Sequence, residues 1–157
     1  MFKIQETTIN GVFEIEMPCF KDLRGGFIKI FQNSIFRDAG IKFSLKESYF
    51  SISEKDVIRG IHFQTPPHQH HKIVFCPFGK VLDVAVDLRK SSPTFGQYYD
   101  TELSAENHKA LFIPEGCAHG FKSLETQSMT FYYVSSEYQK EADAGILWNS
   151  FGMDWRC

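Results

Sequence analysis

The feature that most constrains the fold of this chain is a series of short β-rich segments separated by turn-forming residues. In residues 80–89, one apolar series at positions 82, 84, 86 and 88 alternates with a second series that includes Asp83 and Asp87, which is the period of a strand. Many such strands, at a spacing of about 8–12 residues, predict an all-β sandwich or barrel, most simply a jelly roll. Further segments of this kind cover residues 26–31, 49–53, 58–64, 72–77, 110–114 and 129–135.

The rest of the chain gives little helical signal. Residues 33–40 are predicted to form a short helix, with Asn33 or Ser34 as its N-cap and Gly40 at its end. The 157 residues contain no repeat, no low-complexity tract and no linker-like composition. We therefore expect a single domain that covers residues 1–157.

Composition narrows the class of protein. The net charge of -2, with lysines and arginines scattered singly, gives no reason to expect nucleic acid or an acidic membrane as a partner. The N-terminus has no apolar targeting segment, and no apolar run approaches the length of a membrane span. Cys19, Cys76, Cys117 and Cys157 form no C-x-x-C pair, so we expect free thiols in a reduced, cytoplasmic protein.

Arg59, His62 and Lys72 lie close together in a stretch that is otherwise suited to strands. A neutral histidine can take a proton from carbon near neutral pH, and a cation such as Lys72 can stabilise the resulting enolate. Arginine is shaped to bind phosphate with two parallel hydrogen bonds. Together these residues suggest proton abstraction next to a carbonyl on a phosphorylated substrate.

Neighbouring strand residues are candidates for the remaining roles. If Asp83 faces the interior beside His62, it would orient the imidazole and raise its basicity; a solvent-facing aspartate is the alternative. Only one of the adjacent Tyr132 and Tyr133 can point inward from a regular strand. Its phenol could protonate an enolate from the face opposite the histidine, and a phenol that only packs is the alternative.

The histidines of residues 68–71 offer a different interpretation. His68 and His70, two positions apart on a strand, would point the same way, and His119 would supply a third imidazole for a metal ion. A metal-dependent cupin would be expected to add a carboxylate three or four residues after the second histidine, where this chain has Val74 or Phe75. The missing ligand argues against a metal, and a polar loop is the simpler interpretation.

Segments with a recognisable spacing run in order through nearly the whole chain. Two of them are Arg59-Gly-Ile-His62-Phe-Gln64 and Ile113-Pro-Glu-Gly-Cys-Ala-His119. Each segment is weak alone, and the set is specific. As a set they resemble the dTDP-4-dehydrorhamnose 3,5-epimerase family. The matching segments cover residues 22–27, 59–67, 72–74, 81–89, 92–96, 103–107, 113–121 and 145–149.

The resemblance implies a cupin-type jelly roll that acts as a homodimer without a metal or an organic cofactor. The substrate would be a nucleotide-linked 4-keto-6-deoxyhexose, whose C4 carbonyl acidifies the protons on C3 and C5. By this resemblance His62 is the general base, Lys72 stabilises the enolate and Tyr132 is the acid that returns the proton. Substrate contacts would come from Arg24 and Arg59 at the diphosphate, His119 in the sugar pocket and Tyr138 near the nucleotide base.

The chain departs from the family pattern at several positions. Lys29 stands where the family usually has a glutamate, and Glu47 and Tyr49 replace a glutamine and an asparagine that contact substrate in the family. These changes of charge and bulk imply a different sugar or nucleotide. His70 and His71 replace a glutamine and an alanine. The family continues past this chain with a segment that carries the aspartate paired with the catalytic histidine, so either Asp83 substitutes or the imidazole is less well oriented.

We therefore predict a nucleotide-sugar epimerase of deoxysugar or surface-polysaccharide assembly that inverts C3, C5 or both. One alternative is a sugar-binding module of the same fold with weakened catalysis. A second is a metal-dependent cupin that uses His68, His70 and His119. A ketoisomerase acting on the same 4-keto sugars would carry a His-x-His directly after Arg-Gly, and His62-Phe-Gln64 does not fit that pattern.

Overall fold

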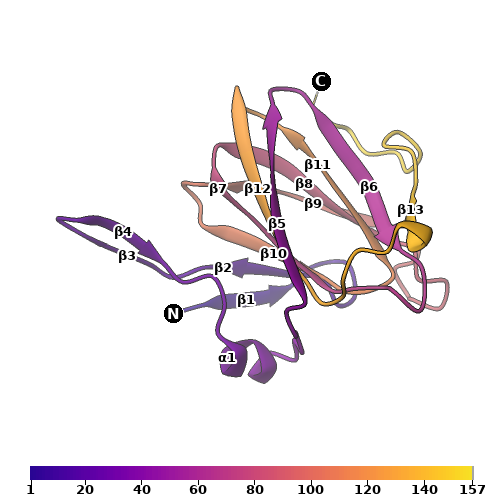
Figure 1. Cartoon of the computed structure of the whole chain (residues 1–157), viewed down its shortest axis with the longest axis horizontal. Helices are drawn as coiled ribbons and strands as arrows, with labels where there is room; N and C mark the ends of the chain where they lie inside the picture. Colours follow the sequence, from indigo (N-terminus) through magenta and orange to yellow (C-terminus); the bar gives the residue numbers. More distant parts are fainter. Residues whose placement is uncertain (157) are drawn as a thin grey trace.

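Two antiparallel sheets pack face to face and make up most of the molecule (Figure 1). The computed structural model describes residues 1–156, and Cys157 lies outside the described part. The predicted all-β jelly roll is confirmed. No helix among residues 1–156 is long and apolar enough to cross a membrane.

The first sheet has six strands. Its strand β7 (Lys72–Phe78), which begins with Lys72, lies between β10 (Lys109–Ile113) and β12 (Gln127–Val134). Its strands β5 and β12 pair along their full length, which sets Tyr49 opposite Tyr132. In spatial order the sheet consists of β1 (Lys3–Glu6), β2 (Phe13–Glu16), β10 (Lys109–Ile113), β7 (Lys72–Phe78), β12 (Gln127–Val134) and β5 (Glu47–Glu54).

The second sheet has five strands, with β11 at its centre. Every residue of β11 is buried, because both faces of this sheet are covered. In spatial order the sheet consists of β13 (Asp143–Gly145), β6 (Ile58–Gln64), β11 (Cys117–Ser123), β8 (Lys80–Asp87) and β9 (Tyr98–Ser104). A single 3₁₀ turn, η1 (Lys140–Ala142), leads into β13.

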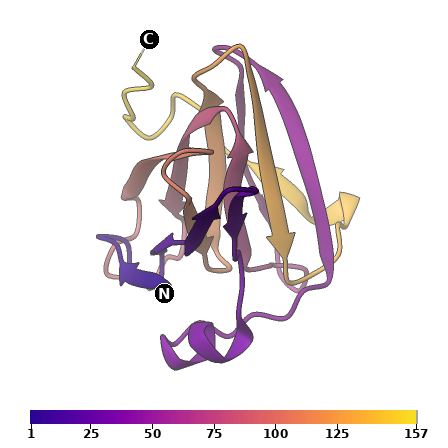
Figure 2. The ribbon, with the colours of Figure 1, turned by 90° about the vertical axis from the view of Figure 1, so that its left-hand side faces the viewer.

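Two small elements lie outside the sandwich. The hairpin of β3 (Cys19–Asp22) and β4 (Gly25–Ile28) projects away from the body in Figure 1. The helix α1 (Asn33–Asp38) lies beyond one end of the sheets, as Figure 2 shows. This helix is shorter than predicted, and its N-cap is Gln32 rather than Asn33 or Ser34.

Apolar side chains are buried in three layers, one between the two sheets and one on the outer face of each sheet. The space between the sheets holds residues of both, including Val74 and Val134 from the first and Ala85 and Phe121 from the second. The outer face of the six-stranded sheet packs on α1 through Phe36. The outer face of the five-stranded sheet is covered by the C-terminal segment, from which residues 153 and 155 are buried.

The cysteines within residues 1–156 are free, and two of them, Cys76 and Cys117, are buried. Burial raises the pKa of each of these two thiols to about 12. Both therefore remain protonated and unreactive near neutral pH. The prediction of free thiols is confirmed for Cys19, Cys76 and Cys117, whereas Cys157 lies outside the described residues.

Candidate active site

A pocket of about 660 Å³ opens where the two sheets face one another. Strands β5, β7 and β12 contribute from one side and β6, β11 and β13 from the other. The lining mixes cations, carboxylates and aromatic rings, as expected for a polar ligand with a ring. It consists of Glu47, Tyr49, Ile58, Arg59, Gly60, His62, Phe63, Gln64, His70, Lys72, His119, Tyr132, Tyr138 and Asp143.

Most of the residues that the sequence suggested come together in this pocket, although they span much of the chain. Three do not line it. Asp83 lies buried beside His119, and Arg24 and Lys29 belong to the region of the projecting hairpin. The suggested residues that line the pocket are His62, Lys72, Tyr132, Arg59, Glu47, Tyr49, His119 and Tyr138.

Arg59 and His62 both line the pocket although they are three positions apart on β6. In a regular strand this spacing would send them to opposite faces. A β-bulge in the pairing of β6 with β11 changes the register between them. Gly60 permits this bulge, because its φ is +121° and a Cβ there would lie only 2.7 Å from the Cα of Gly120 and 2.8 Å from the carbonyl oxygen of His119.

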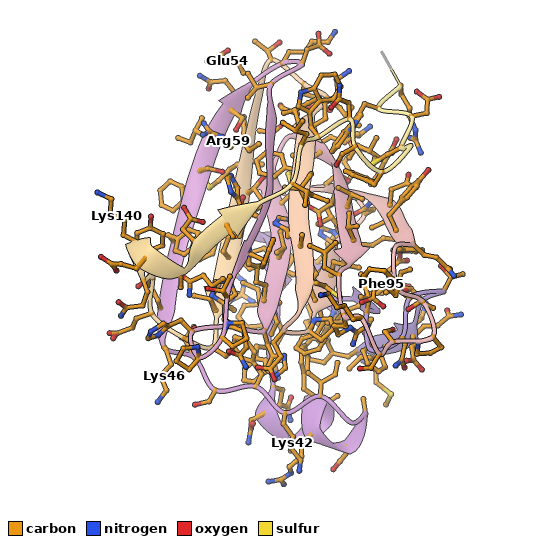
Figure 3. All side chains as sticks on the ribbon, turned by 90° about the vertical axis from the view of Figure 1, so that its right-hand side faces the viewer. Lys42, Lys46, Glu54, Arg59, Phe95 and Lys140 are labelled. Carbon is orange, nitrogen blue, oxygen red and sulfur yellow. The ribbon has the colours of Figure 1, made fainter. Side chains whose placement is uncertain are left out.

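Arg59 is held against the neighbouring strand β5. Its Nε donates to Ser53 Oγ at 2.8 Å, and an Nη donates to the Ile52 carbonyl at 3.1 Å. In Figure 3 it lies between Glu54, the last residue of β5, and Lys46, which precedes that strand. The remaining N–H groups of this exposed guanidinium are available to an anionic group of a ligand.

Lys72 is the buried cation of the pocket, with only 6% of its surface exposed. Burial lowers its pKa from 10.5 to about 8, and the carboxylates of Asp83 and Asp143 oppose this effect. The ammonium is therefore mostly protonated at neutral pH. A cation in such a water-poor position acts strongly on any negative charge that develops nearby.

Asp83 corrects one interpretation of the sequence. Its Oδ1 lies 2.7 Å from Nε2 of His119, and both side chains are buried. Burial raises the pKa of Asp83, while His119 and Lys72 lower it. Within residues 1–156 the ring of His62 makes no hydrogen bond, so this carboxylate orients His119 and not His62.

Tyr132, and not Tyr133, faces the pocket. The Tyr132 side chain is 8% exposed, and its ring lies 4.9 Å from that of Tyr49 and 5.7 Å, edge-on, from that of His119. Tyr133 packs against Phe75 on the opposite face of the sheet. Burial raises the pKa of the Tyr132 phenol, which keeps the proton on its oxygen until a strong base takes it.

Sequence reasoning missed three polar side chains of the pocket. Asp143 lies on β13, a strand of three residues with no detectable pattern. Gln64 ends the Arg59–Gln64 segment, in which its residue type points to no particular role. The sequence marks His70 only as a departure from the family pattern and a possible metal ligand. In the structure, burial lowers its pKa to about 4, with Lys72 and His119 adding to the effect.

The metal-dependent alternative finds no support in the geometry. Among residues 1–156, no group of three or more histidine, cysteine, aspartate or glutamate side chains is placed to hold a metal ion. His119 is hydrogen-bonded to Asp83. His70 Nδ1 lies 3.4 Å from the amide nitrogen of Gln64, and the His68 carbonyl accepts from the same amide at 2.7 Å.

Arg24 and Lys29 lie away from the pocket of their own chain. The Arg24 side chain is 90% exposed and forms an ion pair with Asp22 at the tip of the hairpin. Lys29 Nζ contacts Gln32 Oε1 at 3.4 Å. One copy of the chain therefore does not bring these two cations to the site.

The sequence matches a family model over residues 6–157, and that model describes dTDP-4-dehydrorhamnose 3,5-epimerase. The chain belongs to this family. A family member from Shigella flexneri, a dTDP-4-dehydrorhamnose 3,5-epimerase, is 42% identical over 153 residues, which are 96% of this chain and 84% of that protein.

Solved structures of the dTDP-4-dehydrorhamnose 3,5-epimerase family share the fold closely. The Bacillus anthracis enzyme, with TDP and PPi bound, has a TM-score of 0.95 and 35% identity, covering 99% of this chain and 90% of its own. The Legionella pneumophila enzyme, in complex with dTDP-4-keto-L-rhamnose, has a TM-score of 0.94 and 35% identity, covering 99% of this chain and 84% of its own. The cupin-like fold is thereby confirmed.

Membership of the dTDP-4-dehydrorhamnose 3,5-epimerase family establishes the class of reaction. The protein is an isomerase, a 3,5-epimerase of nucleotide-linked 4-keto-6-deoxyhexoses as used in deoxysugar biosynthesis. The prediction of an epimerase is confirmed.

Proposed function

We propose that His62, Lys72 and Tyr132 carry out the epimerisation, with His62 as base, Lys72 as stabiliser of the enolate and Tyr132 as acid. His62 takes a proton from the carbon next to the C4 carbonyl, and the electron pair moves onto the carbonyl oxygen. The ammonium of Lys72 stabilises this oxyanion. Tyr132 then donates its proton to the same carbon from the other face, which leaves a phenolate and an imidazolium that exchange protons with solvent before the next cycle.

This proposal is carried by one observation: the base and the acid lie on different sheets, which face each other across the pocket. His62 lies on β6 of the five-stranded sheet, and Tyr132 lies on β12 of the six-stranded sheet that faces it. Facing sheets lie about 10 Å apart, which leaves room for a sugar ring between side chains of this size. Inversion requires removal of a proton from one face and its return to the other, and residues on opposite walls supply this arrangement.

The ligand in this proposal is a dTDP-sugar. Arg59 would bind the diphosphate with the N–H groups that Ser53 and Ile52 leave free. His119 would hydrogen-bond the sugar, because it lines the pocket and the buried Asp83 behind it fixes the orientation of its ring. Relatives bind TDP and dTDP-4-keto-L-rhamnose in the same fold, which supports this choice of ligand.

We further propose that the protein works as a homodimer in which the β3–β4 hairpin of each copy reaches the pocket of the other. The hairpin projects from the body (Figure 1) and exposes large apolar side chains, including Leu23 and Phe27. The outer face of the six-stranded sheet also exposes Phe50 and Ile52, each by 53%. Apolar patches of this kind mark interaction surfaces, and the arrangement would supply Arg24 to the site.

The test is incubation of the protein with a dTDP-4-keto-6-deoxyhexose in D₂O, with the C3 and C5 positions followed by NMR. Wild-type protein is expected to introduce deuterium and invert configuration, and His62→Asn should remove both effects. A wild-type protein that binds dTDP without exchanging either proton would contradict the proposal and favour a binding module with weakened catalysis.

A further inference from the structure

The segment 137–139 lies beside the pocket and contributes Tyr138 to its lining, with a side chain that is 55% exposed. It belongs to no strand, so no ladder of backbone hydrogen bonds fixes its position. One backbone bond, from the Ala142 N–H to the Gln139 carbonyl at 3.0 Å, holds its end, and side chains from other elements hold the rest. Glu47, from the first position of β5, accepts a hydrogen bond from the Tyr138 backbone N–H, with a distance of 3.2 Å to Oε2.

Gln64 holds the same segment from the opposite sheet. Its Oε1 accepts from the Gln139 backbone N–H at 2.9 Å, and its Nε2 donates to the Glu137 carbonyl at 3.3 Å. Gln64 is only 4% exposed, so its amide is a fixed anchor. Glu47 from one sheet and Gln64 from the other therefore hold the backbone of three consecutive residues, 137–139.

Within residues 1–156 the side chain of Tyr138 has one polar contact. Its hydroxyl lies 3.4 Å from Oδ2 of Asp143, and both groups are exposed. This contact is long and solvated, so it contributes little to orientation. The direction of the ring is set mainly by the backbone of 137–139, and hence by the two side chains that hold that backbone.

We propose that Glu47 is a positioning residue for the nucleotide, acting through the Tyr138 backbone rather than by touching the ligand. The proposal rests on the proposed function, with a dTDP-sugar in this pocket, and takes the exposed Tyr138 ring that lines it as the surface on which the nucleotide base stacks. A stacking ring held in place before binding loses less conformational entropy when the ligand arrives. This role also explains why a carboxylate, that of Glu47, is compatible with a pocket that binds a diphosphate. Its negative charge accepts a hydrogen bond from a backbone N–H of the protein.

Glu47→Ala should weaken dTDP binding about five- to tenfold, because it removes one hydrogen bond to a charged acceptor at a half-exposed site. The Kd of dTDP is measured by calorimetry, and the KM and kcat of epimerisation by NMR. The loss should appear in Kd and KM and leave kcat less affected. Glu47→Gln should restore most of the affinity, since an amide oxygen accepts the same bond. Glu54→Ala, at the far end of the same strand, is the matched control.

A double-mutant cycle with Tyr138→Ala decides whether Glu47 acts through the tyrosine. If it does, Tyr138→Ala weakens dTDP binding, and adding Glu47→Ala to that variant has no further effect. Additive losses would mean that Glu47 contacts the nucleotide directly, and an unchanged Kd in either single variant would equally overturn the proposal. Failure of wild-type protein to bind dTDP at all would instead reject the proposed function, and this inference with it.

Discussion

Replacement of Lys72 by methionine tests whether a buried ammonium supports catalysis at the expense of stability. The side chain is 6% exposed, and burial lowers its pKa from 10.5 to about 8, against the attraction of Asp83 and Asp143. At about 1.4 kcal/mol for each pH unit, the folded state disfavours the charged lysine by about 3–4 kcal/mol below pH 8. Methionine has a similar shape and carries no charge, so it should remove most of this cost.

The pH dependence of this effect has a definite sign. The pKa is lower in the folded than in the unfolded chain, so the unfolded state binds more protons between pH 8 and pH 10.5. Wild-type stability should therefore gain from this group as the pH rises through that interval. Lys72→Met should be more stable than wild type by about 2–3 kcal/mol at pH 7, and the difference should shrink toward pH 10.5.

Catalysis should change in the opposite direction. Removal of one group that stabilises an oxyanion typically lowers kcat about 10²- to 10³-fold. The assays are denaturant unfolding at pH 7 and pH 10 and deuterium uptake at C3 and C5. Lys46→Met, which removes an exposed lysine next to β5, is the control and should change stability by no more than about 0.5 kcal/mol. A Lys72→Met protein that is less stable than wild type at pH 7 would refute the burial cost, and one that keeps more than about a tenth of the rate would refute the role in catalysis.

Three other predictions follow from the proposed roles. Tyr132→Phe should still exchange substrate protons for deuterium, because His62 can return a proton to the face it came from, but inversion should be lost; NMR of the recovered sugar separates the two effects. In wild type, kcat should fall as the pH rises through about 8, where Lys72 loses its proton, and a profile that stays flat to pH 9 would contradict this. Mixing inactive Arg24→Ala and His62→Asn proteins should restore about a quarter of wild-type activity, because each mixed dimer has one intact site, whereas no recovery would place Arg24 outside the partner's site.

The strand that the sequence predicts most clearly is one in which every second residue is apolar, so that one face is apolar throughout. Residues 80–89 alternate clearly, and β8 follows them closely. Strand β11 was not predicted, because its sequence Cys-Ala-His-Gly-Phe-Lys-Ser has no regular alternation of polar and apolar residues. The C-terminal segment that covers its outer face becomes visible only in three dimensions.

The sequence predicts a site residue well where its residue type limits the chemistry it can do. It predicts poorly where a residue's role depends on its hydrogen-bond partner in the fold. Residue type and spacing suggested His62 and Lys72, the family resemblance suggested Tyr132 over Tyr133, and all three line one pocket. The partner of Asp83 could not be predicted, because His62 and His119 are cross-strand neighbours, and a small difference in register decides which imidazole the carboxylate reaches. The location of Arg24 on a projecting hairpin depends on tertiary structure that no local pattern records.

The bulge in β6 has a consequence for how this pocket can change. Gly60 and Gly120 lie so close that a side chain on either would collide with the other strand, and the contacts at Gly60 include the carbonyl of His119. A mutation there would disturb Arg59, His62 and His119 together. The lining side chains, by contrast, can be exchanged one at a time. A mutant library aimed at new sugar substrates should therefore vary the side chains that line the pocket and leave Gly60 and Gly120 unchanged. The two glycines keep the strands in the register on which the positions of the lining residues depend.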